Sequence, residues 1–141
     1  MAVAVVDSNI LIGIADSDDR HYDVAMEIVQ AMDRGELPTG RVTNYMILEA
    51  LNWIHTRQRH DKAVETHTRL KQSAGFEIHQ AAQKDFQRAV NLFNTFETLS
   101  FGDATIAAYM QREEIQYLYS FDDDFDGLEW ITRLATAENP F

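Results

Sequence analysis

The sequence predicts an α/β fold in which a parallel β-sheet carries helices on both faces. Short apolar or alternating runs near residues 2–6, 76–80 and 116–121 have the composition of strands, and they stand singly along the chain. Longer segments with helical periodicity separate them, and single strands that alternate with helices are typical of parallel sheets. The length of 141 residues predicts one domain, residues 1–141, with a core of its own.

The first half of the chain begins with a strand over residues 2–6, where "AVAVV" is apolar and largely β-branched. A polar break at Asp7–Asn9 follows and leads into a short helix. Residues 21–34 repeat apolar side chains at helical spacing, and Gly35 ends this helix. The segment "LPTGRVTN" is expected to be a loop that leads to the next helix, "TNYMILEALNWIHTR".

In the second half, residues 60–74 are predicted to be a helix, and "FEIHQ" alternates like a strand. Residues 81–96 place apolar side chains on one side of a helix. The segment "LSFGDATIAAYMQREE" opens with a helix-start signal and predicts a helix to about residue 114. "QYLYSF" is the last predicted strand. Four aromatic residues are expected in the core, although one or two of them could face a partner: Phe93, Phe96, Phe101 and Trp130.

The composition is that of a soluble globular protein, with 45% hydrophobic and 25% charged residues. The absence of cysteine excludes a disulfide framework and a thiolate zinc site. No apolar run approaches the roughly 20 residues that span a bilayer, and the first residues lack the basic start and cleavage site of a signal peptide. These features predict a cytoplasmic protein that does not associate with a membrane.

The chain is strongly acidic, with a formal net charge of −11 from 23 acidic and 12 basic residues. Only three of the bases are lysines. Excess acid with scarce lysine fits a protein kept soluble in high salt, and it equally fits an ordinary acidic protein. Because nucleic acid is itself an anion, this balance argues against a sequence-independent electrostatic grip on it.

Two groups of aspartates follow strands of the predicted sheet. Asp7 comes directly after the first strand, and Asp122 opens the run "DDDFD" after a late one. Open α/β sheets bear their sites beyond the carboxyl ends of the strands, so both side chains are expected at one edge. Asp7 also has a structural explanation as a helix cap. The run also fits a solvated loop; if it is extended, Asp122 and Asp124 point the same way.

Two further acids lie in apolar helices. Glu49 and Asn52 are the only polar residues of "YMILEALNWI", and a helix this apolar is predicted to be buried. A buried carboxylate needs a partner; the alternative is a glutamate at the rim of the helix, in contact with water. Asp103 lies in "LSFGDATIAAYM", where Ser100 and Asp103 have the spacing of a capping box. That motif alone would explain Asp103.

Together, Asp7, Glu49, Asp103 and Asp122 are more specific than any one of them, because the fold could gather all four at one edge. Carboxylates with few bases nearby suit Mg²⁺ or Mn²⁺. Such cations activate water and stabilise the charge of an in-line displacement at a phosphodiester. Without a cation, the carboxylates would repel one another, and some would take up protons near neutral pH.

Four segments in this order resemble PIN-domain nucleases, and most of all the VapC-type toxins of toxin–antitoxin pairs: "VVDSNIL", "YMILEAL", "LSFGDATIAAYM" and "YLYSFDDDFD". The resemblance covers nearly the whole chain. It implies a three-layer α/β/α fold with a mainly parallel sheet. It also implies a metal-dependent endoribonuclease that hydrolyses RNA, a homodimer, and a cognate antitoxin protein that inhibits the toxin.

Carried over by position, the catalytic acids of the family fall on Asp7, Glu49, Asp103 and Asp122. The implied ligands of Mg²⁺ or Mn²⁺ are Asp7, Asp103, Asp122 and Asp124, directly or through water. Whether Asp122 or Asp124 is the main fourth acid stays open, because the run holds more aspartates than the family pattern needs. Glu49 is implied either to bind the metal or to orient the attacking water. Small polar residues match positions near the site: Ser8, Asn9 and Ser120.

Other families with acidic or histidine sites fit the sequence less well. A phosphoryl-accepting receiver domain requires a lysine after its last strand, whereas every lysine here precedes that strand. A haloacid-dehalogenase-type phosphatase requires an aspartate at the position of Asn9. His55 and His60 could share acid and base work, but a solvated bend explains them more simply. A catalytically silent PIN-like module that acts through protein or RNA contacts is the alternative from another class, and acids at all four positions argue against it.

Arginines are the candidates for contacts with phosphate groups. Arg57 and Arg59 lie in "HTRQRH", and Arg20 and Arg41 are expected near the edge of the sheet that bears the acids. Each of these arginines is equally well explained as a surface charge.

Overall fold

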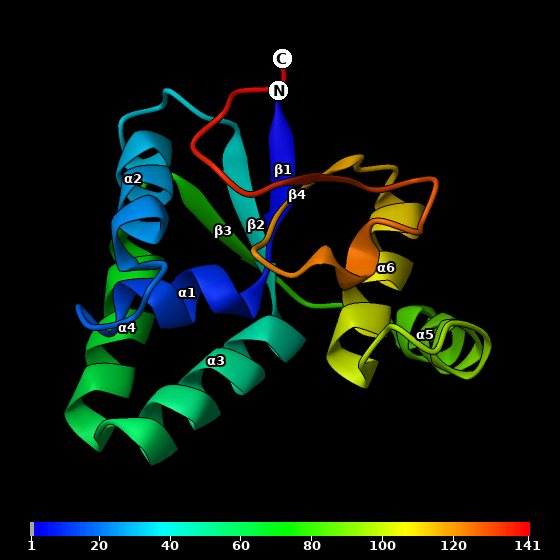
Figure 1. The fold of residues 1–141 in the computed structure, drawn as a ribbon, viewed down its shortest axis with the longest axis horizontal. Coiled ribbons are helices and arrows are strands. Elements are labelled where there is room, and N and C mark those ends of the chain that lie inside the picture. Colours follow the sequence, from blue (N-terminus) through cyan, green and yellow to red (C-terminus); the bar gives the residue numbers. More distant parts are fainter. Residues whose placement is uncertain (1) are drawn as a thin grey trace.

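The computed structural model describes residues 2–141 and shows a parallel sheet between two layers of helices (Figure 1). Within this range the sheet has five strands in the order β3-β2-β1-β4-β5, all parallel. The strands are β1 (Val3–Val6), β2 (Thr39–Thr43), β3 (Phe76–His79), β4 (Tyr117–Tyr119) and β5 (Thr132–Leu134). The α-helices are α1 (Ser8–Ile14), α2 (Tyr22–Asp33), α3 (Asn44–Arg57), α4 (His60–Gln72), α5 (Gln83–Thr95) and α6 (Phe101–Glu113). The predicted three-layer α/β/α fold is confirmed.

Strand β1 lies at the centre of the sheet and of the core. Its residues Ala4, Val5 and Val6 are fully buried, because β2 and β4 pair with its two edges and helices cover its faces. Helices α2 and α4 lie on one side of the sheet, whereas α6 lies on the other, with α5 packed on α6 (Figure 1). Helices α1 and α3 begin where β1 and β2 end, so both start at the carboxyl edge of the sheet.

Local signals set the ends of several helices. The Asp7 carboxylate accepts a hydrogen bond from the Ser8 amide at the start of α1. The Thr43 hydroxyl accepts one from the Met46 amide at the start of α3. Beyond the end of α2, Gly35 adopts a φ of 75°, a conformation that costs glycine little and most other residues more.

The prediction that "LPTGRVTN" is a loop was wrong, because residues 39–43 form strand β2. This strand is held by its neighbours more than by its own sequence. A side chain at Gly40 would collide with Met32, Val6 and Phe76, so glycine permits the close approach of strand and helix. Strand β5 was not predicted either, since its three residues are too few to show an alternating pattern.

The burial expected of several apolar residues is only partly realised. Phe96, Phe101 and Trp130 pack against the core in a half-buried state, but Phe93 is 45% exposed, so its assignment to the core was wrong. Helix α3 was predicted to be buried, yet Leu48 on this helix is 59% exposed. Phe93 still meets the ring of Phe101 edge to face, with 5.6 Å between the two centroids.

None of the helices within residues 2–141 combines the length and the apolar character needed to cross a membrane.

Candidate active site

The carboxyl edge of the sheet gathers the acids that the sequence analysis singled out. Asp7 follows β1, and the Asp122 loop follows the neighbouring strand β4. The Asp7 amide donates to the Tyr119 carbonyl over 3.0 Å, which continues the pairing of β1 with β4 up to the first acid. The topology therefore brings together two segments that are more than 100 residues apart in the sequence.

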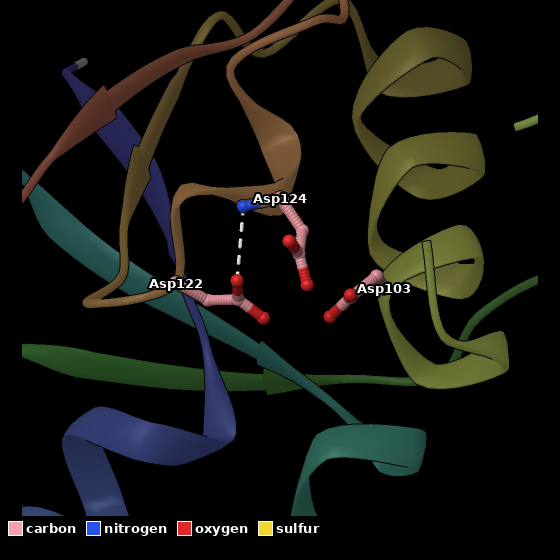
Figure 2. A group of neighbouring side chains, drawn as sticks. All are labelled: Asp103, Asp122 and Asp124. Carbon is pink, nitrogen blue, oxygen red and sulfur yellow. Dashed lines mark hydrogen bonds between the residues drawn. The ribbon is translucent and has the colours of Figure 1, made fainter. Parts of the chain in front are cut away.

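Three aspartates converge within reach of one small ion. Asp103 on α6 and Asp122 and Asp124 in the loop after β4 each offer a carboxylate oxygen, and these oxygens all lie within 4.8 Å of one another. Figure 2 shows the three side chains pointing toward one another, with Asp103 facing the loop across the cluster. We call Asp103, Asp122 and Asp124 the aspartate trio.

Asp103 does form the capping box that explained it in the sequence. Its carboxylate accepts from the Ser100 amide over 3.1 Å, and its own amide donates to the Ser100 hydroxyl over the same distance. The box fixes the first turn of α6 and holds the Asp103 carboxylate at the side facing the other two aspartates. The structural role and a role in the site are therefore compatible.

The sequence left open that the aspartate run after β4 could be extended. The run is not extended. Asp123–Phe125 form a 3₁₀ turn, and the Asp122 carboxylate caps it by accepting from the Asp124 amide over 2.9 Å (Figure 2). Phe125 is fully buried and anchors the turn. The turn, rather than strand alternation, thus brings Asp122 and Asp124 to the same side.

The other two aspartates of the run do not join the trio. Asp126 forms a two-pronged ion pair with Arg133, with distances of 2.8 and 3.0 Å, and this guanidinium lowers the pKa of Asp126. Asp123 is exposed to solvent. The run holds more aspartates than one acidic site needs, and the structure accounts for each of them. Asp122 and Asp124 belong to the trio, Asp126 forms an ion pair, and Asp123 lies at the surface.

Asp7 lies beside the trio in a more enclosed position, with 4% of its surface exposed. One carboxylate oxygen accepts from the Ser8 amide and the other from the Ser120 hydroxyl, each over 2.7 Å. Because hydrogen bonds hold both oxygens, Asp7 is oriented by the protein itself.

Glu49 joins the site from α3 through a serine. The Ser8 hydroxyl donates to a Glu49 oxygen over 2.5 Å and lies 3.4 Å from an Asp7 oxygen. The other Glu49 oxygen lies against Gly102, where a Cβ atom would come closer than van der Waals contact allows. Glu49 is exposed to solvent rather than buried, which agrees with the rim position weighed as the alternative.

Ser120 links the two segments of the site. It is fully buried, and its hydroxyl donates to Asp7 while accepting from the Asp122 amide over 3.0 Å and from the Asn9 side chain over 3.2 Å. The Asn9 side chain also accepts from the Phe121 amide over 3.4 Å. The small polar residues predicted near the acids thus serve to hold them.

Burial, together with the charges of neighbouring acids, raises the pKa of three of these carboxylates. Burial raises the pKa of Asp7 to about 7, and the charges of Asp103 and Glu49 add to this effect. Burial also raises the pKa of Asp103 to about 6, with further contributions from Asp122 and Asp124. The Asp122 charge is the main cause that raises the pKa of Asp124. A nearby cation would favour the charged forms and relieve this repulsion.

The arginines and histidines considered earlier occupy different places. Arg41 does not serve this edge, because it pairs with Glu113 and Glu77 at 3.0 and 3.4 Å. The rings of His55 and His60 meet edge to face near the turn between α3 and α4, 5.6 Å apart. Arg57, in contrast, lines a groove that also includes Glu49.

Two features of the site were not recognised in the sequence, Gly102 and the groove beside it. The groove has a volume of about 540 Å³ and runs between α3 and α6. The only sequence signal for Gly102 was a glycine in the first turn of a predicted helix, where it costs helix stability and so invites a packing reason.

The chain is therefore an α/β protein whose candidate active site is a cluster of aspartates. The cluster lies at the carboxyl edge of a parallel sheet in an α/β/α sandwich. The family model of the PIN domain matches residues 4–131, so the chain belongs to the PIN domain family. A comparison with curated proteins finds no match.

Solved structures share the fold over nearly the full length of both chains. VapC20 of Mycobacterium tuberculosis, described as a sarcin–ricin-loop-cleaving toxin, has a TM-score of 0.77 and 20% identity, covering 92% of this chain and 97% of that one. VapBC2 of Rickettsia felis, solved with a promoter DNA fragment, has a TM-score of 0.70 and 12% identity over 94% and 97%. A toxin–antitoxin complex from Klebsiella pneumoniae has a TM-score of 0.65 and 22% identity over 96% and 98%.

Proposed function

We propose that this chain is a metal-dependent endoribonuclease that acts as the toxin of a toxin–antitoxin pair, with residues 1–141 as one nuclease domain. The observation that carries the proposal is the convergence of Asp103, Asp122 and Asp124 beside Asp7 in a chain of the PIN family. The similarity to VapC20, which is described as a toxin that cleaves the sarcin–ricin loop, supports the choice of RNA as the substrate.

The residues of the trio suit a hard divalent cation, Mg²⁺ or Mn²⁺. Their oxygens are close enough to share one ion, they are the ligand type that these ions prefer, and their mutual repulsion favours a positive charge between them. When bound, the ion supplies charge neutralisation at the phosphate and makes water easier to deprotonate. We assign Asp103, Asp122 and Asp124 as its ligands, so that both acids left open in the loop take part.

Asp7 and Glu49 have different roles in this proposal. Serine hydrogen bonds hold both oxygens of Asp7, so we assign it a contact with the ion through water and the orientation of Ser8. Glu49 lies outside the trio, and Ser8 holds one of its oxygens. Its second oxygen is therefore assigned to orient the attacking water and to accept its proton.

The test is cleavage of a mixed RNA pool by the purified protein with Mg²⁺ or Mn²⁺, at low and at multimolar salt, and again with excess chelator. Asp103→Asn and Asp7→Asn should lower the rate roughly 100-fold or more, the usual cost of losing one electrostatic stabiliser. The exposed Asp18 provides the matched control, and Asp18→Asn should cleave like the wild type. Equal cleavage by all proteins would indicate a contaminating nuclease, and no cleavage without metal binding would favour the silent binding module.

We further propose a homodimer and a cognate antitoxin as partners in the cytoplasm. The similarity to the Klebsiella toxin–antitoxin complex and to the Rickettsia VapBC2 structure supports the antitoxin. Light scattering should give twice the mass of the 16.2 kDa chain. Co-expression with the cognate antitoxin should yield a complex without ribonuclease activity.

A further inference from the structure

We propose that the groove between α3 and α6 binds an unpaired nucleobase of the RNA, next to the bond that is cleaved. This inference rests on the proposed ribonuclease function and adds to it the place where a base beside the cleaved bond is held. The groove has a volume of about 540 Å³, within the range of small-ligand sites in proteins. A base and part of its ribose would fit this space.

The groove is continuous with the candidate active site. Glu49 and Gly102 both line it, Glu49 is tied to Asp7 through Ser8, and Gly102 directly precedes Asp103 of the trio. Because Gly102 lacks a side chain, the Glu49 carboxylate can lie against the first turn of α6. A phosphate held at the trio would therefore have its neighbouring nucleotide at the entrance of the groove.

The lining of the groove has the chemistry that recognises bases. Tyr45, Trp53 and Phe101 supply aromatic surfaces, and bases of single-stranded RNA stack on such rings. Asn52 and Thr56 add an amide and a hydroxyl, which can hydrogen-bond the edge of a base.

Arg57 adds a positive charge at the same place. Its guanidinium lies over the Trp53 ring, 5.7 Å from the centroid, and it pairs with no carboxylate within residues 2–141. A guanidinium in this position can stack on a base or contact the adjoining phosphate. The groove therefore offers an anionic, aromatic ligand two kinds of attraction.

The net charge of the chain increases the share of the RNA affinity that such a subsite has to supply. A protein of net charge −11 gains little from general attraction to the RNA backbone, so stacking has to supply a larger share of the affinity. Stacking in the groove requires a base that is free to leave its neighbours. A base within a duplex is paired and stacked, which restricts the substrate to unpaired segments.

Trp53 makes the proposal directly measurable, because the chain has only two tryptophans. The other, Trp130, donates from its indole to the Ala107 carbonyl and does not line the groove. In a Trp130→Phe protein the fluorescence reports on Trp53 alone. The probe is a six-nucleotide unpaired RNA of mixed sequence, added with excess chelator so that it is bound and not cleaved. We expect saturable quenching, with affinity at least about 10-fold weaker for the same sequence held in a duplex.

Two substitutions test the lining in this background. Phe101→Ala should weaken RNA binding roughly 10-fold through lost stacking. Arg57→Ala should weaken it several-fold, and because Arg57 is exposed this variant should keep its melting temperature. Phe141→Ala removes a 66% exposed aromatic ring that does not line the groove, and it should bind like the parent.

The same variants separate this inference from the proposed activity. In the cleavage assay, Arg57→Ala and Phe101→Ala should raise KM and leave kcat within about 2-fold. Unchanged binding and KM in both variants, with normal cleavage, would overturn the groove and leave the ribonuclease intact. If they instead halve the mass seen by light scattering and leave RNA binding unchanged, the groove is a contact between protein copies and the inference is wrong. RNA binding that depends on the groove in a protein without cleavage would support the groove and overturn the ribonuclease.

Discussion

At the scale of the residue, Asp7 shows how the site balances opposing effects. Burial and the charges of Asp103 and Glu49 favour its protonated form, whereas hydrogen bonds from Ser120 and Ser8 favour the carboxylate. Burial prevails, so the pKa rises to about 7 from an ordinary value of 3.8. The folded protein therefore holds a proton on Asp7 over a pH range in which the unfolded chain has released it.

This shift predicts how stability depends on pH when no divalent cation is present. Between about pH 4 and pH 7 the folded state binds more protons at Asp7 than the unfolded state, so the free energy of unfolding should fall as the pH rises. The contribution of Asp7 is on the order of 2–4 kcal/mol across this range. Urea denaturation in chelator at several pH values measures it.

Asp7→Asn should remove this part of the pH dependence, while the matched surface variant Asp18→Asn should keep it. Asp103, with its pKa raised to about 6, contributes a second and earlier decline that Asp7→Asn leaves in place. A pH profile of Asp7→Asn that runs parallel to that of the wild type would show that Asp7 titrates normally in the folded protein.

Ser120 provides a second prediction at this scale. Its buried hydroxyl bonds Asp7, Asn9 and the Asp122 amide, so Ser120→Ala leaves an acceptor and two donors with one partner fewer. We expect a loss of roughly 1–3 kcal/mol in the free energy of unfolding. The pH-dependent decline should also extend to higher pH, because a bond that lowers the pKa of Asp7 is lost. Ser17→Ala, at an exposed serine, should do neither.

At the scale of the element, the sequence predicted a helix or strand correctly wherever a signal within the segment itself determines it. Periodicity and caps located the helices, since Gly35 and Ser100 act within their own segments. Strand β2 was not predicted because tertiary contacts, rather than its own sequence, stabilise it. Gly40 leaves room for Met32 and Phe76 to pack closely against the strand, and no local sequence pattern shows this. The turn at Asp123–Phe125 was not predicted for a similar reason, since the burial of Phe125 and the cap formed by Asp122 stabilise it.

The same limit applied to the candidate site. Asp7 and Asp122 lie at one edge of the sheet because the strands before them, β1 and β4, are neighbours. The alternation of strands and helices along the chain was enough to predict this. The sequence could not show which aspartates of the loop belong to the cluster. The answer depends on Arg133 of the neighbouring strand β5, which pairs with Asp126. The contact of Glu49 with Gly102 likewise depends on how α3 meets α6.

That contact between two helices yields the third prediction. Gly102→Ala places a methyl group where the Glu49 carboxylate lies, and the long side chain should move away. Alanine is a better helix former than glycine, by about 1 kcal/mol in a helix interior, so stability should be equal or higher. RNA cleavage should nevertheless fall roughly 10-fold or more, because a displaced Glu49 would lose the water-orienting role that we propose for it. Thermal melts and single-turnover cleavage measure the two effects.

A double-mutant comparison checks the cause. If the methyl group acts by displacing Glu49, then Gly102→Ala should have little further effect on cleavage in a Glu49→Gln protein. Equal losses in both backgrounds would mean that the methyl group disturbs α6 or the groove rather than Glu49.

At the scale of the whole molecule, charge is the dominant feature. A net charge of −11 destabilises the compact state through repulsion spread over the surface, and the aspartate trio concentrates part of it at one edge. The spread charge and the trio should respond differently to salt. Monovalent ions screen charges everywhere, with a Debye length of about 10 Å at 0.1 M and about 3 Å at 1 M. A divalent ion stabilises by mass action at its own site.

The last prediction separates these two responses. Raising NaCl from 0.1 to 1 M should raise the melting temperature of the wild type and of an Asp103→Asn/Asp122→Asn variant alike. Millimolar Mn²⁺ should add stability to the wild type only, by about 2.7 kcal/mol at 100 times its Kd. The variant also removes two charges, so Asp18→Asn/Glu65→Gln, which removes two exposed ones, is the matched control and should keep the full response to Mn²⁺. A response to Mn²⁺ that survives in the Asp103→Asn/Asp122→Asn protein would place the ion elsewhere on the acidic surface and remove the trio from the proposed mechanism.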